Sequence, residues 1–300
     1  LNIKNFSFSP TIEENEFLDH LRHRKTFFSM TSRELKSNTF DFYELYNSHK
    51  VLAKKIVIES PELMIAENLK KARVEGKIPT MPNTLVKEMP FYMNINQLEV
   101  HKADIVYNER AKKGSGTGTV YFTDSDVIIE NITNDTTLMS RNTPAVIRAH
   151  TQFMNQGSLS MIMTMPLLED TFSCEYQGVL GSMDAEVINE MIIPNANLGL
   201  KKGEVRRISF NAEIEKGVAT GEMLAKYRSF KVEVYSQNKK RKTILGSFFS
   251  NILIPTNNKK RKGTIYYEAT AADSFMKIIW GGIRSGLKDT LLPGFVVNKV

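Results

Sequence analysis

The 300-residue sequence has one cysteine and five histidines, and these shortages exclude several classes of protein. Cys174 cannot form an internal disulfide, and no group of cysteines and histidines has the spacing of a zinc site. The histidines are scattered, and no serine lies in the context of a nucleophile elbow. We therefore expect a reducing, intracellular compartment, a buried and unreactive Cys174, no cofactor, no metal and no catalytic residues.

Long apolar runs are absent too. No run approaches the length of a membrane span, and the polar opening LNIKNFSFSP is unlike a signal peptide. The sequence therefore predicts a protein that is not secreted and that contacts membranes only peripherally. Its hydrophobic content of 41% is nevertheless enough to build a large buried core.

Basic residues outnumber acidic ones. The chain has 40 Lys and Arg against 33 Asp and Glu, which gives a net charge of +7. Its pI is near 9.2. A positive excess of this kind favours polyanionic partners such as nucleic acid or the headgroups of anionic lipids.

Residues 1–96 have a mostly helical pattern and are expected to form an extension packed on a larger core. The strongest segment is SPELMIAENLKKARVEG, residues 60–76. Ser60 has the character of an N-cap, Pro61 suits the first helical position, and Gly76 suits the stop.

Residues 97–270 change to an alternating pattern. Short runs rich in Val, Ile, Tyr, Phe and Thr are separated by Gly, Asn, Asp or Pro. The clearest is VRRISFNAEIE, in which Phe210, Ala212 and Ile214 would face one side of a half-buried strand. This pattern predicts a mainly β protein with helical extensions, built as a single jelly-roll-like antiparallel β-sandwich.

Residues 271–300 contain a predicted amphipathic helix followed by a tail. The apolar positions of the helix are Phe275, Ile278, Ile279, Ile283 and Leu287, and Gly281 and Gly282 weaken it. Such a helix either packs against the β-core or lies on a membrane surface with Trp280 at the interface.

The segment GTGTVYFTDSD, residues 116–126, ends in two aspartates that carry two interpretations. Asp124 and Asp126, two residues apart on a strand, would project to one face and could bind a divalent cation together with Asp184, Glu186 or Glu190. A structural role at a turn is the commoner one for such an aspartate. The glycines of KKGSGTGT lead into β-formers without a Gly-Lys-Ser/Thr ending, so we expect a hairpin turn there.

Two basic clusters lie between predicted strands and are the candidate nucleic-acid contacts: Lys239, Lys240, Arg241 and Lys242, and Lys259, Lys260, Arg261 and Lys262. Each cluster could contact several phosphates without base specificity. Aromatic residues nearby could stack on unpaired bases: Phe230, Tyr235, Tyr266 and Tyr267. A solvated loop is the alternative for each cluster, and the sequence leaves open whether the two form one surface.

The segment VYNERAKKGSGTGTVYFTDSDVI resembles the diagnostic segment of the thirty-kilodalton superfamily of plant-virus movement proteins. In that family a strand ends in a Leu-x-Asp-like signature and a glycine follows well downstream. Here Phe122-Thr123-Asp124 stands in the signature position, with Phe122 in place of the usual leucine. Gly203 in LGLKKGEVRRISFNAEI resembles the downstream glycine. The resemblance covers roughly residues 103–236.

The resemblance implies a jelly-roll-like β-sandwich that transports a viral genome between plant cells through plasmodesmata. It implies binding of single-stranded nucleic acid, with RNA as the favoured cargo, and self-association that extends in some members to tubules. Peripheral host membrane and plasmodesmal proteins are the implied partners, no reaction is catalysed, and Asp124 has a structural role. The alternatives are a viral coat, nucleocapsid or matrix protein with a jelly-roll fold, and a divalent-metal nuclease using Asp124, Asp126 and Glu186.

Overall fold

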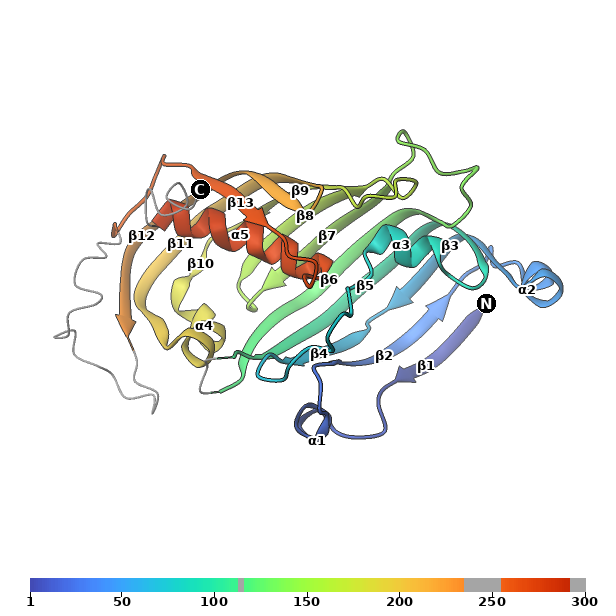
Figure 1. Cartoon of the computed structure of the whole chain (residues 1–300), viewed down its shortest axis with the longest axis horizontal. Coiled ribbons are helices and arrows are strands. Elements are labelled where there is room, and N and C mark those ends of the chain that lie inside the picture. Colours follow the sequence, from blue (N-terminus) through green and yellow to red (C-terminus); the bar gives the residue numbers. More distant parts are fainter. Residues whose placement is uncertain (113–115, 235–254, 292–300) are drawn as a thin grey trace.

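A computed structural model describes residues 1–112, 116–234 and 255–291 (Figure 1). The strands of this part are β1 (Asn2–Phe8), β2 (Thr26–Lys36), β3 (Lys50–Glu59), β4 (Glu62–Asn68), β5 (Tyr92–Arg110), β6 (Gly118–Thr133), β7 (Ala145–Phe153), β8 (Gly157–Met165), β9 (Cys174–Leu180), β10 (Met183–Asp184), β11 (Leu198–Glu215), β12 (Val218–Val234) and β13 (Gly263–Glu268). The helices are α1 (Glu14–His20), α2 (Phe42–Ser48), α3 (Pro82–Lys87), the 3-10 helix η1 (Ala185–Ile188), α4 (Asn189–Ala196) and α5 (Phe275–Leu291).

The chain is mainly β, with one large mixed sheet and a few helices. Strand order along the sheet is β1-β2-β3-β5-β6-β7-β8-β9-β11-β12-β13, and β4 and β10 pair beside this path. This arrangement fits the expected β-sandwich with helical extensions, so the predicted fold class is confirmed. Two of the pairings, β3–β5 and β4–β5, are parallel, which the alternation of short apolar runs does not reveal.

The prediction of a mostly helical region at residues 1–96 is wrong. This region holds the four strands β1 to β4 and the start of β5, and its helices α1, α2 and α3 are short. All four strands pair within the same sheet as the rest of the chain. The N-terminal part is therefore continuous with the core, and residue 97, the expected boundary, lies inside β5.

The segment predicted as a helix, residues 60–76, instead begins with strand β4. β3 and β4 lie in line between β2 and β5, and the chain between them bends at Ser60, which has a φ of 48°. Pro61 has no N–H to give to a ladder, and its carbonyl accepts a hydrogen bond from Asp104 N–H at 2.9 Å. Pairing on both sides satisfies the backbone of β4, which outweighs its local helical preference.

The expected alternation in residues 205–215 is confirmed in β11. Phe210, Ala212 and Ile214 are buried, while Asn211 and Glu213 are exposed. The buried residues face α5, which lies across the strands in Figure 1. We call the side of the sheet that carries α5 the inner face and the opposite side the outer face.

Helix α5 completes the core, as the C-terminal apolar pattern predicts. Ile278 and Ile279 are buried against the inner face, in a cluster with Tyr176, Met223 and Ile265. The alternative in which this apolar side lies on a membrane is not what the structure shows, although Trp280 stays 45% exposed.

Three glycines let α5 approach the sheet closely. A Cβ on Gly281 would lie 2.7 Å from the Tyr267 ring, and one on Gly282 would lie 2.5 Å from the Tyr176 hydroxyl. Gly286 is equally close to Ile265. These glycines weaken the helix locally but set its distance from the sheet. Among the described helices, including α5, none combines the length and the apolar character needed to cross a membrane.

Candidate nucleic-acid interface

The second predicted basic cluster, Lys259 to Lys262, lies between β12 and β13 at one edge of the sheet. Lys259, Lys260 and Lys262 are exposed, and Lys262 Nζ lies 2.8 Å from both carboxylate oxygens of Glu222. Arg261 differs from its neighbours, because its Nε and one Nη atom are buried and have no hydrogen-bond partner. The first predicted cluster, Lys239 to Lys242, lies outside the described residues.

Asn258 fixes this cluster to strand β12. It forms an isolated bridge with Tyr227, and its side-chain amide donates to the carbonyls of Ala225 at 2.8 Å and Arg261 at 2.9 Å. The Arg261 N–H donates back to Asn258 Oδ1 at 3.1 Å. Asn258 is only 8% exposed, so these bonds are shielded from water and hold the lysines next to β12.

Cations also face one another across β11 and β12. Arg207 is directly opposite Lys226, and Lys202 is directly opposite Lys231. All four side chains are exposed, and none forms an ion pair with a carboxylate in the described part of the chain. Like charges directly opposite each other destabilise a sheet. The two pairs therefore make this part of β11 and β12 a site where binding of an anion would relieve the repulsion.

The three segments 198–208, 225–234 and 255–262 together form what we call the basic patch. They contain eleven Lys and Arg and two Glu, an excess of nine positive charges, whereas the whole chain has an excess of seven. The remainder of the sequence is thus slightly acidic. The basic character of the protein is concentrated in about a tenth of its length. Of these basic residues, only Lys259 to Lys262 form a run that is visible in the sequence. The other basic residues of the patch are dispersed along β11 and β12.

An open groove of about 450 Å³ runs over the outer face next to the basic patch. Outward-facing side chains from β8, β9, β11 and β12 line it: Ser160, Ile162, Gln177, Val179, Ser209, Asn211, Glu222 and Leu224, with Lys262 at its rim. Its floor is formed by the residues between them, whose side chains face α5. Ser209 and Leu224 are paired with each other, two residues along from the Arg207 and Lys226 pair on the same face.

The aromatic residues expected to stack on bases are mostly committed elsewhere. Phe230 stacks on Tyr227 with ring centroids 4.3 Å apart, and the Tyr267 hydroxyl donates to Asp273 at 2.9 Å. Tyr266 is 46% exposed and remains available. Tyr235 lies outside the described residues.

Asp124 and Asp126 lie within β6, at an irregularity in its pairing. Asp124 is exposed with a φ of 49°, and its N–H donates to Asp104 Oδ1 at 3.0 Å. Asp126 Oδ1 accepts from the Lys102 N–H at 3.2 Å. These bonds satisfy backbone groups that the bulge leaves out of the ladder.

The other two signature residues have packing roles. The Phe122 ring lies 5.5 Å from that of Phe153 on β7. Gly203 lies beneath Phe230, so that a Cβ on it would be 2.4 Å from that ring. Asp124 on β6 and Gly203 on β11 are separated in the sheet by β7, β8 and β9, so the structure does not bring them together.

The acidic residues considered as metal ligands and Cys174 all lie in the described part of the chain. Within residues 1–112, 116–234 and 255–291, no group of three or more His, Cys, Asp or Glu could hold a metal ion. This range includes Asp124, Asp126, Asp184, Glu186 and Glu190. Burial raises the pKa of the Cys174 thiol to about 12, because the thiolate would lose its hydration.

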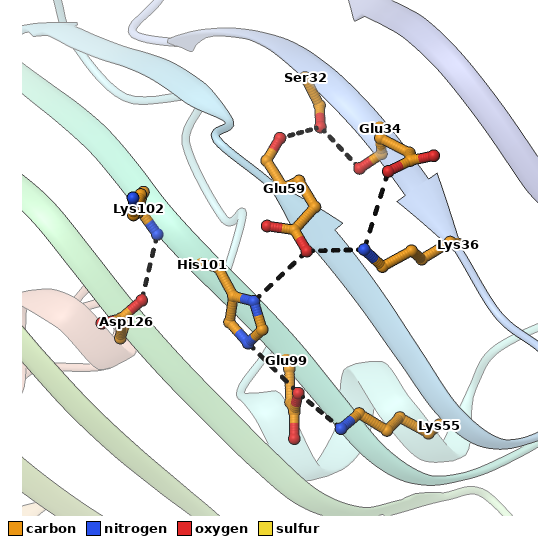
Figure 2. A network of polar contacts seen from close by, with 9 residues as sticks. All are labelled: Ser32, Glu34, Lys36, Lys55, Glu59, Glu99, His101, Lys102 and Asp126. Carbon is orange, nitrogen blue, oxygen red and sulfur yellow. Dashed lines mark hydrogen bonds and ion pairs between the residues drawn. The ribbon is translucent and has the colours of Figure 1, made fainter.

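A second charged region lies on the outer face of β2, β3 and β5 (Figure 2). Lys36 Nζ lies 2.9 Å from Glu59 Oε1, and Lys55 Nζ lies 2.8 Å from Glu99 Oε2. His101 sits between the two carboxylates, with Nδ1 3.5 Å from Glu59 and Nε2 3.2 Å from Glu99. In this network, which we call the mixed network, the two carboxylates alternate with Lys36, His101 and Lys55.

No protein-family model matches the chain, and no curated protein matches it.

Proposed function

We propose that this protein binds single-stranded nucleic acid without base specificity, through phosphate contacts on the basic patch. The observation that carries this proposal is the direct opposition of Arg207 and Lys226 on the outer face, close to the exposed lysines of the 258–262 loop. A phosphate placed between two facing cations removes their repulsion and releases the counterions that each holds in water. Lys259 and Lys260 extend the same positive surface, whereas Lys262 is paired with Glu222.

The biological setting we propose is cell-to-cell transport of a viral genome through plasmodesmata. The mainly β fold and the resemblance of the segment around Asp124 to plant-virus movement proteins support this setting. The chain would then self-associate, and its partners would be an RNA genome, peripheral host membrane and plasmodesmal proteins.

A salt titration tests the binding proposal. The dissociation constant of a single-stranded oligoribonucleotide should rise steeply with salt, with a slope of about 0.7 in log Kd against log salt for each phosphate contacted. Replacing Lys259 and Lys260 together with serine should lower that slope by about 1.4. Binding that hardly changes between low and high salt would show that the basic patch is not the interface.

Location and rescue test the biological setting. The tagged protein should form puncta at the walls of leaf epidermal cells and should restore the spread of a movement-deficient virus. Co-purification with virus particles, without puncta and without rescue, would favour the coat or nucleocapsid alternative over transport.

A further inference from the structure

Phosphate contacts alone do not distinguish one strand from two. A surface of lysines and arginines binds any polyanion, because every nucleic acid presents phosphates. Discrimination in favour of single strands needs a place for the bases that a duplex keeps stacked inside. Single-strand binders commonly use aromatic platforms, and here only Tyr266 among the described candidate aromatics is exposed enough to serve as one.

The groove beside the basic patch has the lining that a base needs. Gln177 and Asn211 are exposed and directly opposite each other on β9 and β11. Each amide offers both a donor and an acceptor, the combination that pairs with the edges of bases. Ile162, Val179 and Leu224 supply apolar surface for the flat face of a ring. The volume of about 450 Å³ lies within the range of about 300–1,000 Å³ that is usual for small-molecule sites.

Position links the groove to the basic patch. Ser209 and Leu224, at the groove, are two residues from Arg207 and Lys226 along uninterrupted pairing. At about 3.3 Å per residue this separation is about 7 Å, within the reach of one nucleotide. Lys262, which belongs to the basic patch, lies at the rim of the groove. None of the described helices covers the groove, which is lined by strand residues and Lys262.

We propose that the groove receives unpaired bases of the strand whose phosphates lie on the basic patch, so that the protein prefers single-stranded nucleic acid to duplex. This proposal rests on the proposed function. Gln177 and Asn211 would contact base edges, and the apolar side chains beside them would contact base faces. Its ligand is therefore a nucleobase in an open strand, not a phosphate.

The test compares three polymers of equal length: a single-stranded oligoribonucleotide, its abasic ribose-phosphate counterpart and its duplex. The wild-type protein should bind the single strand about tenfold more tightly than the abasic polymer, as expected for the loss of two modest hydrogen bonds and their apolar contacts. Gln177→Leu with Asn211→Leu should abolish that difference and leave the affinity for the abasic polymer and the salt dependence unchanged.

The matched control replaces Thr220 and Thr264, which are on the same face but outside the groove, with leucine; it should keep the tenfold preference. Circular dichroism and thermal unfolding establish that each variant folds, and all four side chains are at least partly exposed. Equal binding of intact and abasic polymers by the wild type, or an unchanged preference in the groove variant, would overturn the groove proposal alone. Absence of binding to all three polymers would overturn the proposed function with it.

Discussion

The outer face of the sheet carries two charged regions that differ in whether the cations facing each other across the strands are matched by carboxylates. In the mixed network of β2, β3 and β5, Lys36 and Lys55 each contact a carboxylate within 3 Å. In the basic patch, Arg207 faces Lys226 and Lys202 faces Lys231. Both regions lie on paired strands of the same sheet. The difference is therefore one of sequence, not of fold.

The charges of the mixed network stabilise the sheet, whereas the facing cations of the basic patch destabilise it. Exposed opposite charges across strands add modest stability, and facing like charges subtract it. The lysines of the mixed network are neutralised by its own carboxylates and need no external anion. The basic patch gains from one, which is why we assign the ligand to it.

The largest expected effect is stabilisation by the ligand. A single-stranded oligoribonucleotide at 100 times its Kd should raise the free energy of unfolding by about 2.7 kcal/mol, because it binds only the folded protein. The Tm measured by differential scanning fluorimetry should rise accordingly. The Lys36→Ala and Lys55→Ala double variant should show the same rise. A smaller rise in that variant would place ligand on the mixed network and erase the distinction between the regions.

Removing the facing cations should have the next largest effect. Arg207→Ala with Lys226→Ala should weaken binding of the oligoribonucleotide about tenfold at 0.1 M salt and reduce the salt slope by about 1.4. Fluorescence anisotropy measures both quantities. Lys36→Ala with Lys55→Ala removes the same charge from the same face and is the control. Equal losses in the two variants would mean that only net charge matters.

A single reversal should separate stability from binding. Lys226→Glu turns the repulsive pair with Arg207 into an attractive one, so the free energy of unfolding should increase by about 0.5 kcal/mol while affinity falls. Urea denaturation and anisotropy on the same sample provide the two readings. If this variant is less stable than the wild type, the opposition of the two cations is not a strain on the sheet.

The smallest effect concerns pH and the mixed network. A hydrogen bond from Lys36 holds the pKa of Glu59 below its ordinary value of 4.5. A carboxyl group whose folded pKa is depressed contributes stability above its unfolded pKa, and that contribution disappears as the pH falls through the lower, folded value. Glu59→Gln should therefore lower the Tm by no more than about 2 °C at pH 7. The difference should vanish well below pH 4.5, and a difference that persists there would contradict the assignment.

The sequence predicted the parts of the fold that depend on local pattern. The alternation around Phe210 and Ile214 predicted a half-buried strand, and the spacing of Ile278 and Ile279 predicted the core side of α5. The prediction from sequence failed at Ser60 and Pro61. A Ser-Pro pair is typical of a helix start, but here it forms the bend between the collinear strands β3 and β4. Pairing partners decided the outcome, and they are distant in the sequence.

The candidate site was predictable only where it is contiguous. The run Lys259 to Lys262 is visible in the sequence, whereas the opposition of Arg207 and Lys226 depends on the register of β11 and β12. That register contains irregularities near Lys202 and Val205, which no count of residues along two strands could supply. Arg261 illustrates the converse, since it belongs to the visible run but its guanidinium is partly buried.

The close seating of α5 has a practical consequence for anyone who shortens this chain. Its glycines bring the helix so near to the strands that Tyr176, Met223 and Ile265 depend on it for shelter from water. A stop codon or a protease cut ahead of residue 275 would expose the apolar inner face of the sheet. It would not give a smaller functional protein. Tags are better attached beyond this helix, and truncation series should not be used to map functions to the C-terminal end.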